Sequence, residues 1–445
     1  MSQSSLDLSI VTGEPMESFF KERLQALHLS DSISIRTVNS SVGKGMFAEK
    51  AFGENEIIYN EMQMFGRKLH DQVFDSCQNC LRVIGDLEQQ WECCESHKPR
   101  HDCHCDHGSD CSQDDDHHHE KFCDAHQGEI ESESRVPCPD FDGICSKIDL
   151  PLHEVVIPEP ISCRQGCGFI YCSNDCADQH WQSSHQLMCA ANNCQMQEFV
   201  DFTNETNEVL YMVGQVISAL IIQIERAGST PEDLAEALVP LRMFIAKPWT
   251  EVVSVPPELD RHEADEFIRV LEFLIDECHQ HLSAALPDYS SSELYASLFS
   301  REFISRLMGL FETNNIRMSS RSAIALFADK LEDLEEIPSE LSEEQIQRLA
   351  SYQDISVEGV GLYSLHSCMN HSCDPNCILL KLQGGADAKV ALIALRKISK
   401  DEEITISYID ESADLKDRHA MLVDYGFKCQ CTKCVLEGMT ISDAA

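Results

Sequence analysis

Basic residues are scarce in this chain of 445 residues, which has 34 lysines and arginines against 76 aspartates and glutamates. The formal net charge is therefore −42. Nonspecific binding to nucleic acid needs Lys and Arg to displace counterions, so direct nucleic-acid binding is not expected. An acidic chain favours basic partners, which long-range attraction would steer, although the same charge also serves solubility alone.

Long hydrophobic runs are missing as well. The first 24 residues contain no apolar stretch after a basic start, and so they do not resemble a signal peptide. The longest apolar run, Met212–Ile224, is too short to span a bilayer and is interrupted by Gln215, Ser218 and Gln223. We therefore expect a buried helix there. We also expect a soluble intracellular protein of nucleus and cytoplasm that has no contact with membranes.

Cysteine, in contrast, is abundant. The chain has 23 cysteines, an odd number, and 43% of its residues are hydrophobic. In a reducing compartment, such cysteines are more often metal ligands than disulfides. The length and the apolar content predict a large core and two to four domains.

Strand and helix patterns occupy different parts of the chain. β-Branched and alternating residues predict short strands around a Gly turn within 34–62, and strand patterns return after about residue 359. Between 196 and 350, apolar residues recur with helical spacing. This order predicts an α+β fold in which strands distant in sequence close the same sheets. No repeat of fixed period is present.

Paired ligands two to four residues apart are typical of tetrahedral zinc sites. Three cysteine pairs and one H-x3-C pair have this spacing, enough for two four-ligand sites. They are Cys77 and Cys80, Cys163 and Cys167, Cys172 and Cys176, and His185 and Cys189. His185 and Cys189 are expected to share one face of a helix, with Trp181 packed one turn below.

Residues 93–126 are rich in Cys, His and Asp and cannot form an apolar core. Two interpretations remain open for this run. It is either an additional metal site or a disordered acidic insert that binds zinc weakly, and we favour the second.

The sequence NHSCDPNC at residues 370–377 is dense in polar ligands. A C-x-C-x2-C cluster lies further on, at Cys429, Cys431 and Cys434. Three thiolates leave a zinc site one ligand short. Either Cys373 or Cys377 can supply the fourth ligand and so connect the two segments.

Several motifs occur together in a fixed order: VGKGMFA, WQSSHQLMC, GVGLY, NHSCDPNC, EITISYID and YGFKCQCTKC. In this order they resemble the SET and MYND domain family of protein lysine methyltransferases, over nearly the whole chain. The resemblance implies a split SET-domain β-fold with an inserted MYND zinc module, a helical SET insert and a zinc-binding post-SET segment. The spacing C-x3-C at Cys163 departs from the usual C-x2-C. The implied divisions are a leader (1–32), the first SET part (33–76), the MYND module (77–190) with an insert at about 91–128, the helical insert (191–350), the SET core (351–410) and post-SET with a short tail (411–445).

The resemblance also implies S-adenosylmethionine as methyl donor, about three structural zinc ions and Cys373 as the fourth post-SET ligand. Glycines allow the backbone to pass close to a ligand, and aromatic residues offer a surface for adenine. The implied cofactor-binding residues are Gly43, Lys44, Gly45, Asn314, Ser367, Asn370, His371, Tyr408, Tyr425 and Phe427.

Tyr408 is the predicted catalytic residue. Methyl transfer is an in-line displacement by a neutral lysine amine, so alignment matters more than acid–base power. A phenol with an unperturbed pKa of about 10 is a poor general base, but its hydroxyl can orient the amine.

The resemblance suggests basic substrates such as histones or ribosomal proteins, in keeping with the acidic charge, and we expect a monomer. The competing hypothesis is a catalytically weak zinc-dependent adaptor whose MYND module binds proline-containing peptides in transcriptional regulation. The intact GKG, NHSC and SY motifs favour the enzyme.

Overall fold

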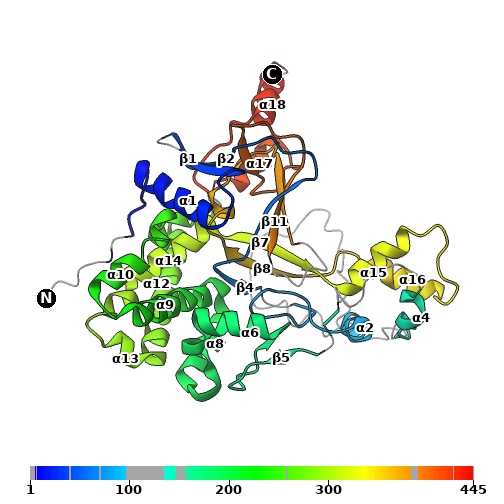
Figure 1. Cartoon of the computed structure of the whole chain (residues 1–445), viewed down its shortest axis with the longest axis horizontal. Helices are drawn as coiled ribbons and strands as arrows, with labels where there is room; N and C mark the ends of the chain where they lie inside the picture. The colour runs from blue at the N-terminus through cyan, green and yellow to red at the C-terminus, as the bar shows by residue number, and fades with distance from the viewer. Residues whose placement is uncertain are drawn as a thin grey trace.

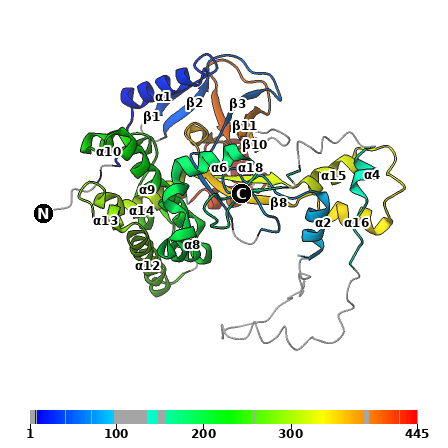
Figure 2. The same ribbon diagram turned by 60° about the horizontal axis from the view of Figure 1, so that its bottom comes forward.

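The computed structural model describes residues 6, 8–39, 42–69, 72–96, 135–146, 156–157, 159–256, 259–381, 389–423 and 425–443. Small β-sheets occupy the centre of the molecule, and helices lie on two opposite sides of them (Figures 1 and 2). The predicted α+β class is confirmed.

One four-stranded sheet joins the two ends of the chain. Its order is β1 (Ile33–Asn39), β2 (Gly43–Ala48), β12 (Glu403–Ile406) and β9 (Asn370–His371). β2 pairs antiparallel with both β1 and β12, whereas β9 runs parallel to β12. The prediction that sequence-distant strands close the same sheet is therefore confirmed.

The other sheets of the described residues also combine early and late strands. Two have three strands, in the orders β10-β11-β3 and β4-β8-β7, and the hairpin β5-β6 forms a two-stranded sheet. Their strands are β3 (Ile57–Glu61), β4 (Phe65–Lys68), β5 (Ile161–Ser162), β6 (Ile170–Tyr171), β7 (Ile316–Arg321), β8 (Ser356–Leu362), β10 (Cys377–Lys381) and β11 (Val390–Ala394).

Helices from the middle of the chain cover one side of the sheets (Figure 1). They are α8 (Cys194–Thr206), α9 (Glu208–Ala227), α10 (Pro231–Ala237), α11 (Trp249–Val252), α12 (Arg261–Ala285), α13 (Pro287–Ser290) and α14 (Arg301–Asn314). By length and composition α9 could cross a membrane, but 72% of its apolar window is buried inside the protein. The predicted buried helix is thus confirmed.

The N-terminal residues, predicted as a leader, contain a packed helix. α1 (Glu14–Ala26) buries Met16, Phe20 and Leu24, which are spaced four residues apart on one face. Its Glu17 carboxylate accepts a hydrogen bond from the Thr37 backbone N–H at 2.9 Å, which ties α1 to β1.

A second group of helices lies on the other side of the sheets (Figures 1 and 2). It consists of α2 (Leu87–Ser96), α4 (Phe141–Cys145), α15 (Ala323–Glu332) and α16 (Glu343–Ser351). These helices share an apolar core of their own, in which Phe141 lies 6.2 Å from Trp91 and 5.0 Å from Phe327, centroid to centroid. Two helices from within the predicted MYND module therefore pack here with two helices from the later part of the chain.

Glu95 corrects the expectation for the start of the Cys/His/Asp-rich run. Its fully buried carboxylate accepts hydrogen bonds from the Tyr352 hydroxyl at 2.8 Å and the Val136 N–H at 3.0 Å, and lies 3.5 Å from Arg348. Residues 93–96 are therefore helical, because α2 continues through them, and Cys94 and Glu95 among them are buried. The remainder of the run, 97–126, lies outside the described residues.

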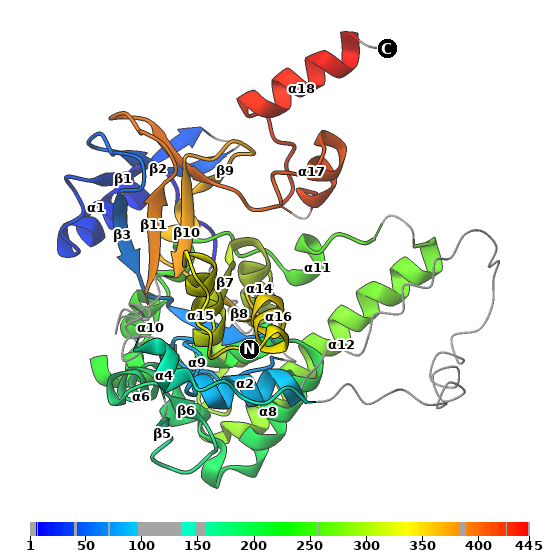
Figure 3. The ribbon, with the colours of Figure 1, turned by 90° about the vertical axis from the view of Figure 1, so that its right-hand side faces the viewer.

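The C-terminal part ends in α17 (Leu415–Met421) and α18 (Thr432–Asp443). Both lie beyond the four-stranded sheet, with α18 at the far end of the molecule (Figure 3). Cys429 and Cys431 lie between these two helices, and Cys434 lies in the first turn of α18.

Candidate active site and zinc centres

The twelve predicted zinc ligands gather into three groups of four. The groups are Cys77, Cys80, Cys172 and Cys176; Cys163, Cys167, His185 and Cys189; and Cys373, Cys429, Cys431 and Cys434. Ligand atoms about 2.3 Å from a tetrahedral ion lie about 3.8 Å apart. The sulfur–sulfur distances of 3.6 Å for Cys80–Cys172 and 3.8 Å for Cys163–Cys189 fit this geometry. All three sites are thus suited to structural zinc.

The first two groups interleave along the chain. The first pair of cysteines combines with the third pair, and the second pair combines with His185 and Cys189. His185 Nε2 lies 3.4 Å from the sulfurs of both Cys163 and Cys167, so the longer C-x3-C spacing still closes the site. The helix α6 (Asn174–His180) continues into a π-helical turn, where Trp181 packs edge-on against His185 at 5.9 Å.

The loop that carries the first cysteine pair, residues 77–81, is embedded in the β-sheets; we call it the knuckle loop. The Lys381 ammonium at the end of β10 donates to the Cys80 carbonyl, and Gln63 donates to the Asn79 carbonyl at 2.6 Å. Leu81 packs into a small apolar cluster with Tyr363. The first zinc group therefore lies against the central strands, β10 among them.

The third group settles which cysteine of NHSCDPNC joins the post-SET cluster. Cys373 Sγ lies 3.5 Å from Cys434 Sγ, whereas Cys377 is buried in β10 and lines the pocket described below. Buried Arg418 donates to Glu437 at 2.7 Å and contacts the Cys434 sulfur at 3.6 Å, which holds α17 and α18 together at the cluster.

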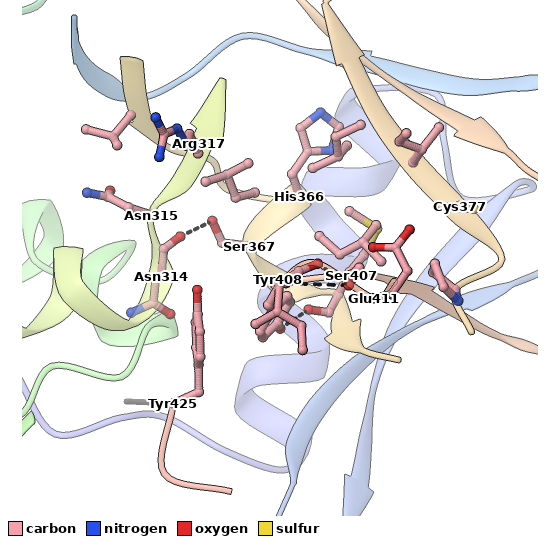
Figure 4. A pocket seen from close by; sticks show the side chains of 18 of the residues that line it. Asn314, Asn315, Arg317, His366, Ser367, Cys377, Ser407, Tyr408, Glu411 and Tyr425 are labelled. Carbon is pink, nitrogen blue, oxygen red and sulfur yellow. Dashed lines mark hydrogen bonds between the residues drawn. The ribbon is translucent and has the colours of Figure 1, made fainter. Parts of the chain in front are cut away.

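A pocket of about 460 Å³ opens between β7, β10 and the segment after β12 (Figure 4). Tyr408 and Ser367 line it from within, with Asn315 and Arg317 on one side and Cys377 and Glu411 on the other. Its volume falls in the range of about 300–1,000 Å³ typical of small-molecule sites.

Tyr408 connects this pocket to β9. Its hydroxyl donates to the Met369 carbonyl at 2.5 Å, and its backbone N–H donates to His371 Nδ1 at 3.1 Å. Burial raises the pKa of Tyr408 above its usual value, so the phenol stays neutral. The Tyr425 ring packs against it with centroids 5.0 Å apart.

The remaining predicted cofactor residues lie on both sides of Tyr408. Asn314 and Ser367 line the pocket and are joined by a hydrogen bond from the Ser367 hydroxyl to the Asn314 carbonyl at 2.9 Å. His371 lies beside the other aromatic residue of the post-SET segment, with its ring 6.0 Å from that of Phe427. Burial lowers the pKa of His371 to about 4, so its imidazole is neutral at physiological pH.

The GKG turn lies next to Asn370, outside the pocket. Asn370 donates to the Lys44 carbonyl at 3.0 Å and to the Glu403 carboxylate at 2.7 Å. A Cβ at Gly45 would lie 2.7 Å from the side chains of both Glu403 and Val38, so any other residue would force these side chains to move. Gly43 has a φ of +83°, which also favours glycine.

The Lys44 ammonium uses few of its N–H donors. In the described part of the chain, its ammonium donates to the Met243 carbonyl at 2.5 Å and lies 5.3 Å from the centre of the Phe244 ring. An ammonium has three N–H groups, so this one bond leaves two of them, and burial disfavours the charged form by lowering the pKa of Lys44. An anion such as the carboxylate of S-adenosylmethionine would compensate that charge.

Sequence reasoning missed the carboxylate that fixes the segment before Asn370. Glu61, at the end of β3, accepts hydrogen bonds from the Ser364 hydroxyl at 2.6 Å and from the backbone N–H groups of Leu365 and His366 at 2.9 and 2.8 Å. No motif identifies Glu61, because its partners lie about 300 residues away. The acidic residues 402 and 403 before ITISY are a local signal that could have drawn attention to Glu403.

Comparison with known proteins places this geometry in a family. Residues 43–409 match the SET domain. The histone-lysine N-methyltransferase ATXR2 of Arabidopsis thaliana is 30% identical over 91% of this chain and 90% of its own length. The protein-lysine N-trimethyltransferases SMYD5 of Danio rerio and Homo sapiens are each 23% identical, over 95% and 91% of this chain and 91% and 87% of their own lengths. The predicted resemblance to the SET and MYND domain family is confirmed, and the two SMYD5 matches extend over nearly the whole chain.

Proposed function

Since the chain belongs to the SET domain family, we propose that it is an S-adenosylmethionine-dependent protein-lysine N-methyltransferase that acts on basic proteins such as histones or ribosomal proteins. Relatives that match it over nearly its whole length are named as lysine methyltransferases. The observation that carries the proposal is a pocket that suits a lysine side chain and has the tyrosine Tyr408 in its lining.

The polar lining of the pocket favours a cation. Glu411 offers a carboxylate and Asn315 Oδ1 is a buried acceptor with no hydrogen bond among the described residues. Of the two lining groups that could be positive, Arg317 is paired with Glu358 at 3.1 Å, and burial lowers the pKa of His366 so that it is neutral.

The apolar lining suits the methylene stem of the same side chain. Ile316, Val360 and Leu379 line the walls. A lysine stem can be buried along apolar surface while its charged end reaches polar groups. The pocket thus has a place for each part of a lysine.

Tyr408 would hold the amine for reaction. Because its own proton is donated to the Met369 carbonyl, its oxygen is left to accept an N–H from the substrate. Its neutral phenol cannot take the ammonium proton, which has to pass to solvent before the amine attacks. The contribution of Tyr408 is then alignment, which can account for much of a barrier in group transfer.

S-adenosylmethionine, when bound, supplies an electrophilic methyl group on a sulfonium. Gly43, Gly45 and Asn370 would give it a close backbone approach, and Lys44 would pair with its carboxylate. His371, Asn314, Ser367, Tyr425 and Phe427 are the further residues that we propose around it. Asn314, Ser367 and Tyr425 line the pocket together with Tyr408, whereas the GKG turn, Asn370 and His371 lie outside it. Tyr408 would therefore lie where the methyl group and the amine meet.

A peptide array incubated with cofactor carrying a labelled methyl group tests the proposal. Peptides from histones and ribosomal proteins should acquire label on lysine, and replacement of that lysine by arginine should abolish the signal. If the protein binds cofactor in calorimetry yet labels no lysine in any peptide or basic protein, the proposed activity is wrong.

A further inference from the structure

The mouth of the pocket differs from one side to the other (Figure 4). Glu411 is exposed on the side where Cys377 also lies. Ile378, the next residue of β10, and Leu395, which is hydrogen-bonded to Asn376, also line the pocket and are 38% and 42% exposed. Arg317 lies on the opposite side, where the ion pair with Glu358 compensates its charge. An incoming peptide therefore meets an acidic and apolar edge on one side only.

Glu411 is the one acidic residue among those that line the pocket in the described part of the chain. Its backbone is fixed, since the Lys433 ammonium donates to the Glu411 carbonyl at 2.6 Å, and no hydrogen bond or ion pair of its carboxylate is found among the described residues. Because Glu411 follows Tyr408 by three residues, the two are placed together by one short segment. The carboxylate is thus held at the mouth and remains open to a cation from outside.

Ile378 and Leu395 add exposed apolar surface to the lining, beside the strand that carries Cys377. Leu395 is held in place because its N–H donates to the Asn376 carbonyl at 2.8 Å, and Ile378 lies on β10 opposite Ile393. Apolar side chains exposed next to a pocket lose water when a ligand covers them, which favours an aliphatic contact.

From this arrangement we infer that the enzyme selects lysines that have both a second basic residue and an aliphatic residue close by in the substrate. Glu411 forms an ion pair with the basic neighbour, and Ile378 and Leu395 make apolar contact with the aliphatic one. This inference depends on the proposed function, because it concerns the peptide around the methylated lysine. It adds a sequence preference that the net charge of the whole chain does not supply.

Three peptides that differ at one residue beside the target lysine, Arg, Ala or Glu, would test the role of Glu411. An exposed ion pair contributes up to about 1 kcal/mol, so we expect kcat/KM to be about fivefold higher for Arg than for Ala. The difference should lie in KM, since Glu411 contacts the peptide before and during transfer alike. It should shrink as the ionic strength is raised, because salt screens exposed charges.

Glu411→Lys should reverse the order, so that the Glu peptide becomes the better substrate. Glu336→Lys is the matched control, because it changes the net charge equally at an exposed position between α15 and α16, away from the pocket. If both variants shift the preference equally, the selection comes from net charge and the inference is overturned. It is also overturned if the wild type and Glu411→Lys methylate all three peptides equally well.

The apolar half of the inference has its own test. Leu395→Ser should reduce the preference for a peptide with leucine over one with serine beside the lysine, while the preference for arginine remains. An unchanged leucine preference would remove Leu395 from the recognition surface. A wild-type enzyme that methylates none of these peptides or any basic protein would count against the proposed function instead.

Discussion

Two zinc-binding regions of this molecule use the same chemistry in different surroundings. The knuckle loop (residues 77–81) of the first zinc group is embedded among strands, with Leu81 buried and Lys381 donating to the Cys80 carbonyl. The post-SET group instead joins Cys373 to a C-terminal segment that exposes Val423 and Phe427.

The difference suggests different tasks for the two regions. Zinc beside the knuckle loop supports packing that extends into β8, β10 and β11, so its loss should affect the stability of the whole. Zinc at the post-SET group fixes a few residues beside His371 and Tyr408, so its loss should affect the reaction more than the fold. The following variants test that contrast.

The largest expected effect is that of Cys373→Ser. Serine is a poor zinc ligand, and structural zinc in small modules contributes on the order of 10 kcal/mol to folding. The zinc content should fall from about three to about two per chain, because one of three groups is broken. Methyl transfer should be abolished and calorimetric cofactor binding weakened, because Phe427 would lose its position near His371.

The matched control is Cys194→Ser, which changes an exposed cysteine outside the three groups. It should keep three zinc ions and full activity. Wild-type cofactor affinity in Cys373→Ser would refute the idea that the post-SET zinc positions the cofactor site.

Tyr408→Phe should separate chemistry from metal binding. It removes one hydroxyl and the hydrogen bond to the Met369 carbonyl, but little volume. We expect kcat to fall about 100-fold, as a misaligned amine would cause, with zinc content and cofactor affinity unchanged. Single-turnover kinetics with metal analysis would measure this. A variant that loses zinc would show that Tyr408 is needed for the post-SET structure as well.

A smaller effect should distinguish the two groups within the predicted MYND module. Cys80→Ser should lower the melting temperature of the whole chain more than Cys167→Ser, because Cys80 belongs to the knuckle loop whereas Cys167 is half-buried. Both should lose one zinc. Differential scanning calorimetry at matched zinc content gives the comparison, and equal melting temperatures would contradict it.

The smallest effect is expected for Lys381→Met. The substitution keeps most of the buried volume but leaves the Cys80 carbonyl without this donor. A typical net loss for one hydrogen bond is about 1 kcal/mol, which urea denaturation can resolve. A stabilised variant would mean that the cost of burying the ammonium, whose pKa burial lowers, exceeds the value of its hydrogen bond.

The zinc ligands could be predicted from the sequence because each pair is local and only the pairing of pairs depends on the fold. Tyr408 and Asn370 could be predicted for a similar reason, since their motifs are short and specific. The alternatives Cys373 and Cys377 could not be separated by spacing. The structure separates them because Cys377 enters β10, where its side chain turns away from the post-SET cysteines.

What sequence reasoning missed depends on contacts between distant segments. Glu61 is ordinary in its own strand, and its role exists only where β3 meets residues 364–366. Glu95 was assigned to a polar run, although its carboxylate is buried. Tyr352 and Arg348, which compensate this burial, come about 250 residues later in the chain. The helix α1 was a different kind of miss, since Met16, Phe20 and Leu24 already show its spacing.

The four-stranded sheet also has a consequence for synthesis. β1 and β2 leave the ribosome early, but β12 and β9, which complete their sheet, follow near the end of the chain. At about 5–20 residues per second, the edge of β2 waits on the order of tens of seconds for its partner. An unpaired strand edge is a template for wrong association, so the nascent chain should need a chaperone during that interval.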